Sequence, residues 1–403
     1  MIYRWVRSAL ALVGLMMATN MTSTTRGGDE PVKKPADALP EVEQLPNPFV
    51  FLDGSPVLTP ADWSRRRDEL KALFQAYEYG QLPPKPDSTT VTRGEVSDGP
   101  MAKTSRQDSE VTLEHLGKKL VLHIRLTWPK GATGRLPVVL RGGLVRAAAN
   151  RPASDDSQIY LDRGIAVAEF DFAEVAVDNK DNIRSSGVYT LFGDKLDAGA
   201  LMAWAWGFHR VIDALETIQE VDPKRIIVTG HSRYGKAALV AGAFDDRIAL
   251  TVPNHSGCGG AAPYRYLYGK SEALHNIVGR FPYWFRADFN QFVGQVKRLP
   301  IDQHQLRVLV APRAVLAVEG TLDPWSNPEG SQLAHQASLR VYEFLGVPDR
   351  VGIRFRPVGH VVTSEDVADF ADHLFFDKPM PDDFNKLPYP NESNGFDWDK
   401  PTP

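Results

Sequence analysis

From residue 62 onward, short apolar segments of strand length alternate with longer segments of helical periodicity. Such alternation is typical of an α/β fold built on a largely parallel sheet. The clearest helix, 201–218, has apolar residues three and four positions apart and ends before Asp222 and Pro223. The sequence therefore predicts a three-layer sandwich with a mostly parallel central sheet. Apolar runs without polar alternation predict its buried central strands, at 136–140, 165–170, 225–229, 313–318 and 351–355.

The composition excludes several classes of partner and of binding site. With 43% hydrophobic residues in 403, the chain can bury a large core. Its 46 basic and 50 acidic residues leave a net charge of -4, which is too balanced for a nucleic-acid partner or a stable membrane partner. Cys258 is the single cysteine, so intrachain disulfides and a Cys-rich zinc site are excluded, and we expect it to be small buried packing.

The N-terminus predicts export. Arg4 and Arg7 precede an apolar run at 9–18, which is shorter than the roughly 20 residues of a membrane-spanning helix. We expect a secretory signal peptide over 1–24 and a periplasmic or extracellular protein; an N-terminal membrane anchor is the alternative. A polar, proline-containing linker is predicted over 25–47, and a single domain over 48–403, monomeric, whose first part wraps around it. The proline-rich tail, 379–403, should lie on the surface.

The strongest local signal is the sequence at 225–238, RIIVTGHSRYGKAA. It reads as a short strand, a tight turn that carries Ser232, and a helix rich in small residues, which is the arrangement of a nucleophile elbow. Gly230 and Gly235 lack side chains where such a turn is crowded. Tyr234 stands where the general GxSxG pattern has glycine, so an ordinary turn with a capping serine is the alternative. The first amides of the helix could hold an oxyanion.

These residues resemble the glucuronoyl esterases of carbohydrate esterase family 15, whose elbow follows a GxSRxGK pattern. The resemblance extends over about residues 137–372 and implies an α/β-hydrolase catalytic domain with serine esterase chemistry, of a bacterial type. Further stretches similar to the family, in the same order, are SGCGG from Ser256, FPYWF from Phe281, DQHQL from Asp302, APR from Ala311, DPWSNPEG from Asp323, and Gly359-His360.

A serine hydroxyl needs a histidine to take its proton and a carboxylate to orient that histidine. His360 follows the last predicted strand, and it matches the family histidine. His231, next to the nucleophile in sequence, should point elsewhere and be structural. His304 and His373 are interpreted as hydrogen-bonded scaffold groups.

The carboxylate of the catalytic set is less certain from sequence. The resemblance implies Asp323, because members of the family, chiefly bacterial, use an aspartate on the loop after the next-to-last strand. Glu319, at the end of that strand, is the alternative, and Asp323 could instead cap a turn before Pro324. Many fungal members have a glutamate immediately before the SGxGG motif, where this chain has His255.

The resemblance also implies residues that bind substrate. Arg233 would help stabilise the oxyanion, and Lys236, Trp325 and Glu272 would contact the uronate. Arg280 occupies the position where fungal members have a second sugar-binding glutamate. The alternatives are a solvated helix face for Arg233 and Lys236 and core packing for Trp325.

Together these features predict a secreted serine esterase that hydrolyses esters of glucuronic acid or 4-O-methylglucuronic acid, as in linkages between lignin and glucuronoxylan. Its partner would be a uronic-acid-containing polysaccharide ester. Two alternatives are an esterase for acetyl or other acyl groups on polysaccharides and a non-catalytic carbohydrate-binding protein with a hydrolase fold. No cofactor and no metal ion are expected, since HExxH, P-loop, EF-hand and dinucleotide patterns do not occur.

Overall fold

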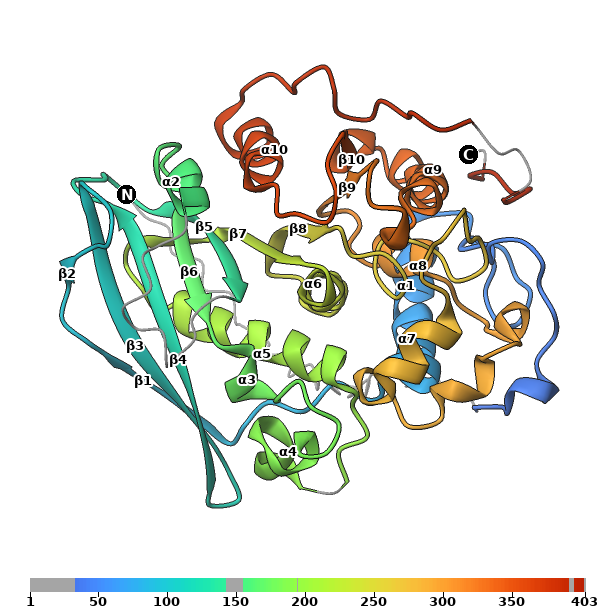
Figure 1. The fold of residues 1–403 in the computed structure, drawn as a ribbon, viewed down its shortest axis with the longest axis horizontal. Helices are drawn as coiled ribbons and strands as arrows, with labels where there is room; N and C mark the ends of the chain where they lie inside the picture. The colour runs from blue at the N-terminus through green and yellow to red at the C-terminus, as the bar shows by residue number, and fades with distance from the viewer. Residues whose placement is uncertain (1–32, 143–154, 194, 391–394, 402–403) are drawn as a thin grey trace, which may run out of the picture.

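The computed structural model describes residues 33–142, 155–193, 195–390 and 395–401. Within them, one ten-stranded sheet runs in the order β1-β3-β4-β6-β5-β7-β8-β9-β10, with β2 paired to β3. From β6 to β10 all neighbours are parallel, whereas β1, β3 and β4 form an antiparallel extension at one edge (Figure 1). The strands are β1 Ser88–Arg93, β2 Ser97–Asp98, β3 Thr104–His115, β4 Lys118–Pro129, β5 Leu136–Gly142, β6 Ala166–Phe170, β7 Val221–His231, β8 Ile248–Asn254, β9 Ala314–Gly320 and β10 Val351–Arg356.

Helices cover both faces of this sheet. Successive residues of a central strand point to opposite faces, and accordingly Val138 belongs to one buried cluster and Val139 to the other. The larger cluster packs under α5 and α6, and the smaller under α2 and α10, on the opposite side (Figure 1). The predicted three-layer α/β sandwich is therefore confirmed. The helices are α1 Pro60–Phe74, α2 Asp155–Leu161, α3 Phe172–Val175, α4 Gly187–Phe192, α5 Ala200–Leu215, α6 Arg233–Phe244, α7 Leu274–Arg280, α8 Gln303–Val308, α9 Pro328–Phe344 and α10 Ser364–Phe376.

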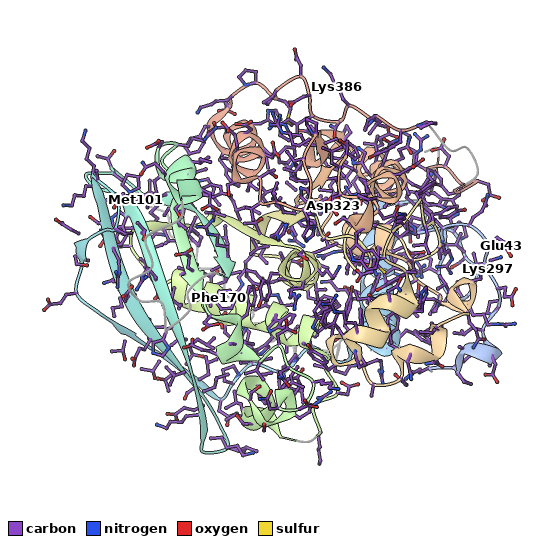
Figure 2. All side chains as sticks on the ribbon, in the orientation of Figure 1. Glu43, Met101, Phe170, Lys297, Asp323 and Lys386 are labelled. Atoms are coloured by element: carbon purple, nitrogen blue, oxygen red, sulfur yellow. The ribbon has the colours of Figure 1, made fainter. Side chains whose placement is uncertain are left out.

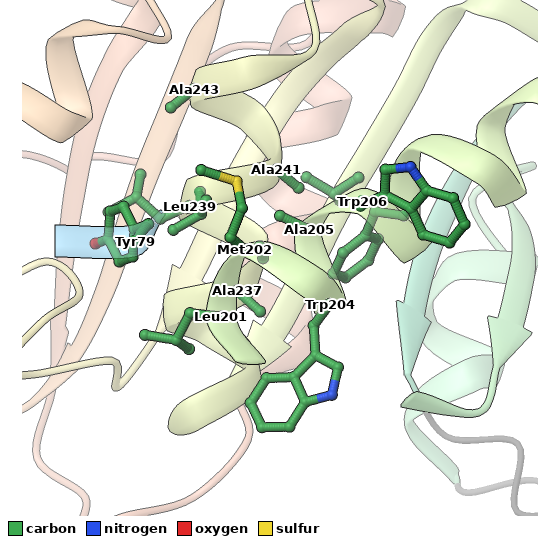
Figure 3. Packing of buried hydrophobic residues seen from close by; sticks show 14 of the residues in the cluster. Tyr79, Leu201, Met202, Trp204, Ala205, Trp206, Ala237, Leu239, Ala241 and Ala243 are labelled. Atoms are coloured by element: carbon green, nitrogen blue, oxygen red, sulfur yellow. The ribbon is translucent and has the colours of Figure 1, made fainter. Parts of the chain in front are cut away.

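Helix α5 is buried on nearly all sides rather than along the single stripe that the sequence predicts. It packs against α6, whose small residues such as Ala237 and Ala241 let the two helices approach closely (Figure 3), and α6 in turn packs on β7 and β8. Trp204 and Trp206 then fill the space around α5 and bury their indole N–H groups against the carbonyl oxygens of Ala176 and Pro84. This packing fixes the helix that follows the nucleophile elbow.

Two strand predictions need correction. β8 was not predicted, although it is a central strand between β7 and β9. The segment 351–355 does form β10, but β10 lies at the edge of the sheet instead of the centre. Its outer side is covered by the C-terminal tail, in which Phe384 forms an antiparallel bridge with Arg354, so an edge strand has the burial pattern of an inner one.

The predicted linker is also wrong for its described part, from residue 33 onward. Leu39 and Leu45 are buried, and the Pro46 carbonyl oxygen lies 2.8 Å from Nε2 of His304. The reason is that isolated apolar residues in this polar segment dock into the domain, where the Trp398 indole of the C-terminal tail donates to the Leu45 carbonyl. Surface ion pairs such as that of Glu43 with Lys297 also join this segment to the domain (Figure 2).

The predicted signal peptide, 1–24, and the start of the linker lie outside the described residues. Among the residues that the structure describes, no helix has the length and apolar character needed to cross a lipid bilayer.

Candidate active site

The carboxyl ends of four adjacent parallel strands bring the candidate residues together. Ser232 directly follows β7, and His255 follows β8, with His231 and Asn254 in register at the ends of those strands. Asp323 and His360 lie on the loops that leave β9 and β10. Because the carboxyl ends of parallel strands share one edge of the sheet, residues distant in sequence meet there.

Ser232 occupies a strained corner between β7 and α6. Its backbone has φ 58° and ψ -122°, a conformation that costs a non-glycine residue about 1–3 kcal/mol. The Ser232 amide donates to the Asn254 carbonyl (2.9 Å), and its carbonyl accepts from the Lys236 amide (3.1 Å). These bonds hold the corner, and the first free amides of α6 point toward the same end of the sheet.

The two glycines of the elbow are required by close backbone contacts. A Cβ at Gly230 would lie 2.2 Å from the Tyr234 carbonyl oxygen, and one at Gly235 would lie 2.8 Å from that of Gly230. The side chain of Tyr234 instead packs on the core and stacks on the buried Phe172, with ring centroids 4.2 Å apart. The departure from the GxSxG pattern is thus explained, because the close approach to the strand falls on residue 235.

His360 and Asp323 are joined by a short hydrogen bond, 2.6 Å from Nδ1 to Oδ2. The Ser326 hydroxyl donates to the same carboxylate oxygen at 2.5 Å. Burial alone would raise the pKa of Asp323, but the hydrogen bonds from His255, Ser326 and His360 outweigh it and hold that pKa well below its usual range. Asp323 is therefore an anion at neutral pH, and it keeps the proton of His360 on Nδ1, which leaves Nε2 free to act as a base.

Ser232 and His360 line one pocket of about 160 Å³. Within the described residues, no hydrogen bond joins the Ser232 hydroxyl to His360; in ligand-free enzymes such bonds often tighten only once substrate is bound. The other lining residues are Arg233, Lys236, His255, Ser256, Gly257, Glu272, Arg280, Phe281, Trp284, Trp325 and Ser326.

Arg233 is held at the pocket by a carboxylate. Its guanidinium donates to Asp178, which also accepts from the Tyr283 hydroxyl (2.7 Å) and the Trp284 indole (2.8 Å). The guanidinium lies 5.1 Å from the centre of the Trp284 ring and 5.2 Å from that of Phe281, within the range of cation–π attraction. Arg233 is thus a fixed cation beside Ser232 rather than a solvated helix residue.

Lys236 is buried beneath the pocket, which also excludes a solvated helix face. Its ammonium donates to the carbonyl oxygens of Ser256 (2.5 Å) and Cys258 (2.7 Å) and lies 3.8 Å from Glu272. Burial lowers the pKa of Lys236, with Glu272 acting in the opposite direction. The glycine-rich segment from Ser256 therefore supplies the acceptors for this cation.

Trp325, Glu272 and Arg280 form the outer part of the pocket. Trp325 is 49% exposed, so it is not a core residue, and its carbonyl accepts from the Glu272 amide at 3.0 Å. Arg280 is exposed and lies 5.1 Å from the centre of the Phe281 ring. In the described structure it forms no ion pair, so it places a free cation at the mouth of the pocket.

Comparison with known proteins identifies the family. A family model described as "Glucuronyl esterase, fungi" matches residues 111–346, more than half of the chain. A 4-O-methyl-glucuronoyl methylesterase from Phanerochaete carnosa is 33% identical over 390 residues, which cover 94% of this chain and 91% of that protein.

This chain is a member of the glucuronoyl esterase family. It is accordingly a carboxylic ester hydrolase, and the resemblance to carbohydrate esterase family 15 is confirmed. A carbohydrate esterase from an unknown prokaryotic organism is 32% identical over 391 residues, covering 82% of this chain and 89% of that protein. Relatives of this glucuronoyl esterase therefore include both fungal and prokaryotic proteins.

Solved structures agree with the fold of this glucuronoyl esterase. The family 15 glucuronoyl esterase from Caldicellulosiruptor kristjansonii has a TM-score of 0.76 and 35% identity, covering 89% of this chain and 97% of that one. The catalytic domain from Hypocrea jecorina has a TM-score of 0.74 and 30% identity, with 90% and 98% covered. The α/β-hydrolase fold of the chain is therefore confirmed.

The other histidines of this glucuronoyl esterase occupy different places. The prediction that His231 points away from the site is wrong, since its ring centroid lies 4.4 Å from that of His360. Burial and the neighbouring His360 and His255 lower the pKa of His231 to about 4, so it is neutral at pH 7. His304 is buried, and Nδ1 of His373 lies 3.0 Å from the Lys378 carbonyl oxygen, as expected of scaffold groups.

Glu319, the alternative acid, lies apart from His360. Its carboxylate is fully buried, and in the described structure it makes no hydrogen bond with that imidazole. Burial raises the pKa of Glu319 to about 8, so at pH 7 it is mostly neutral and unsuited to stabilise an imidazolium. Of the two candidates, the geometry places Asp323 at His360.

Three side chains of this site were not found from sequence. Asp178 lies in a loop without a recognisable motif, and Ser326 lies inside the DPWSNPEG stretch without a predicted role. The third, His255, was noted only as a departure from the fungal pattern. It is buried, and its Nδ1 lies 3.3 Å from Oδ2 of Asp323.

His255, Asp323 and His360 are also the one group of described residues whose potential metal-ligating atoms lie within 4.8 Å of one another. Nδ1 of both rings hydrogen-bonds the carboxylate. The protons of these two hydrogen bonds lie between the ring nitrogens and the carboxylate oxygen. The three side chains therefore form a hydrogen-bonded network.

Proposed function

We propose that this glucuronoyl esterase hydrolyses esters of glucuronic acid and 4-O-methylglucuronic acid through a Ser232–His360–Asp323 triad. The observation that carries the proposal is the 2.6 Å hydrogen bond between Asp323 and His360 in a pocket that also holds the strained Ser232. A strained serine next to an oriented imidazole is the arrangement required for acyl transfer.

In the first half of the reaction, the Ser232 hydroxyl attacks the uronoyl carbonyl carbon, and Nε2 of His360 takes its proton. The carbonyl oxygen becomes an oxyanion, stabilised by Arg233 and the first amides of α6. The tetrahedral intermediate then collapses, the ester C–O bond breaks, and His360 returns the proton to the departing alcohol. Asp323 remains ionised throughout and stabilises the imidazolium.

In the second half, water replaces the alcohol. His360 takes a proton from the water as it attacks the acyl-enzyme, and the same proton then goes to the Ser232 oxygen as the uronic acid leaves. Both half-reactions use one base and one oxyanion site, and every proton that His360 accepts is returned.

The substrate class is supported by the relatives and by the pocket. Curated relatives are named 4-O-methyl-glucuronoyl methylesterases. A serine-to-alanine mutant of the Sporotrichum thermophile esterase, with a TM-score of 0.69 and 29% identity, is described in complex with methyl 4-O-methyl-β-D-glucopyranuronate. In the pocket of this chain, Lys236, Glu272 and Trp325 offer an ammonium, a carboxylate and an aromatic face, which suit sugar hydroxyls and a sugar ring.

The alcohol side favours a bulky apolar leaving group, as in esters that link lignin alcohols to glucuronoxylan. His360 must face the departing oxygen, so the alcohol lies toward the loops that carry His360 and Asp323. Three apolar side chains on these loops are solvent-exposed: Leu322 (66%), Val361 (46%) and Val362 (53%). Apolar surface beside a pocket often marks a binding site.

The triad is tested by hydrolysis of a glucuronate benzyl ester. We expect Ser232→Ala to lose about 10⁴-fold or more in kcat, whereas Ser97→Ala on the exposed strand β2 retains the wild-type rate. Equal rates for Ser232→Ala and wild type would refute the mechanism. A clear preference for acetylated xylan over the uronate ester would instead favour the acetyl esterase alternative.

The alcohol preference is tested by the ratio of kcat/KM for benzyl and methyl glucuronate. We expect Leu322→Ser combined with Val362→Ser to lower that ratio by about fivefold. The control Leu58→Ser, which changes an exposed leucine in the segment before α1, should leave it unchanged. An unchanged ratio in the double variant would contradict the assignment of the alcohol side.

Export fits the same proposal, because polysaccharide esters of plant cell walls lie outside the cell. The sequence of residues 1–24, with its basic start and short apolar run, supports a secretory signal.

A further inference from the structure

His255 lies directly beneath the proposed triad, in a conformation that its surroundings impose. It has a positive φ of 46°, and its amide donates to the Val318 carbonyl at 2.8 Å, immediately after β8. The ring lies against Gly320, where a Cβ would come within 2.6 Å of Cε1 of His255. The absence of a side chain at residue 320 therefore makes the room that this buried imidazole occupies.

His255 shares one carboxylate oxygen with His360. Its Nδ1 lies 3.3 Å from Oδ2 of Asp323, the atom that also accepts from His360 at 2.6 Å. Since an ionised carboxylate can only accept, both imidazoles must carry a proton on Nδ1. Nε2 of His255 is buried without a hydrogen-bond partner in the described structure, so the interaction with Asp323 is the one hydrogen bond of this ring there.

We infer that His255 is a positioning residue, which fixes the Asp323 carboxylate toward His360 and offsets part of its negative charge. This inference rests on the proposed triad. Asp323 lies on a loop rather than on a strand, and Ser326, the side-chain donor to this carboxylate besides the two histidines among the described residues, lies on the same loop. His255 ties the carboxylate to the sheet, because it extends from β8 and reaches the carboxylate across the strand ends.

A second consequence concerns the pH range of activity. A donor to Asp323 competes for the negative charge that stabilises the His360 imidazolium, so we expect the loss of His255 to change the pH dependence of activity. The groups around His360 are His231 at the end of β7, His255 after β8, and Asp323 with Ser326 after β9. Glu319 is a further carboxyl group that interacts electrostatically with Asp323.

The test compares two substitutions at residue 255. His255→Phe retains a ring but removes the donor, whereas His255→Asn places an amide N–H close to where Nδ1–H was. For His255→Phe we expect kcat to fall about tenfold, KM to change less than about twofold, and the acid limb of kcat/KM to shift. His255→Asn should restore both the rate and the pH profile to near wild type.

His255→Ala provides a second route to the same result, because it removes the donor without requiring the site to accommodate a larger ring. We expect it to reproduce the rate loss and the shift of the acid limb, so the inference remains testable if the phenylalanine variant fails to fold. A wild-type kcat and pH profile in His255→Phe, or equal defects in His255→Phe and His255→Asn, would overturn it. Wild-type activity in Asp323→Asn would instead refute the triad itself, so the two failures are distinguishable.

Discussion

The carboxylate of Asp178 should control how well Arg233 stabilises the oxyanion. Asp178→Asn removes the negative charge that holds the Arg233 guanidinium but keeps an oxygen for the Tyr283 hydroxyl and the Trp284 indole. The pocket should therefore retain its shape while Arg233 becomes free to leave its position.

The size of the effect follows from the contacts. A hydrogen bond to a charged group contributes about 1.5–3 kcal/mol, and the Arg233 side chain is 36% exposed, so solvent screening favours the lower end. About 1.5 kcal/mol corresponds to roughly a tenfold loss in kcat. Complete removal of the donor in Arg233→Ala should cost more, about 10²–10³-fold, as for other oxyanion-hole groups.

The assay is steady-state hydrolysis of glucuronate benzyl ester at pH 7. We expect Asp178→Asn to lower kcat with little change in KM, because an interaction made only with the oxyanion acts on the transition state. Tyr283→Phe is the matched control, since it removes another donor to the same carboxylate and should stay within about threefold of wild type. A wild-type kcat in Asp178→Asn alongside a large loss in Arg233→Ala would refute the reasoning.

Three further predictions concern the triad acid, a buried carboxyl group and the elbow. Asp323→Asn should lower kcat by about 10⁴-fold with an unchanged melting temperature, because an amide cannot hold the imidazole in the required tautomer; kinetics and thermal melts check both. Burial raises the pKa of Glu319 to about 8, so between about pH 4.5 and pH 8 the folded chain holds a proton that the unfolded chain has released. The free energy of unfolding should therefore fall by about 1.4 kcal/mol per pH unit from this group. Glu319→Gln should make the free energy of unfolding less dependent on pH in denaturant melts at pH 5 and pH 8, and an unchanged dependence would contradict this. Gly230→Ala should lower the melting temperature and abolish activity, since its Cβ would meet a backbone oxygen at 2.2 Å, whereas Gly279→Ala, with open space around the Cβ, should do neither.

The layered fold could be predicted because its signal is local. Buried strands such as 225–229 are nearly continuous apolar runs, and the helix 201–218 has a clear period, so element type follows from the residues themselves. The position of a strand within the sheet is a tertiary property. β10 resembles an inner strand because the tail covers it through Phe384, and no local pattern reports that contact.

The residues of the candidate site likewise include some with a local sequence signature and some whose role depends on tertiary contacts. Ser232 and His360 could be found because an elbow and a strand-end histidine have sequence signatures. Asp178 could not, because its role depends on a loop that folds back onto Arg233 from 55 residues away in sequence. The role of His255 likewise requires knowing that Gly320 leaves room for its ring.

Labelling with a fluorophosphonate, followed by peptide mass spectrometry, tests most directly whether an imidazole-activated serine performs the chemistry. We predict a single adduct on the hydroxyl of Ser232, formed at least about 10²-fold more slowly in His360→Ala. An adduct on a different residue, or equally fast labelling without the imidazole, would contradict the account.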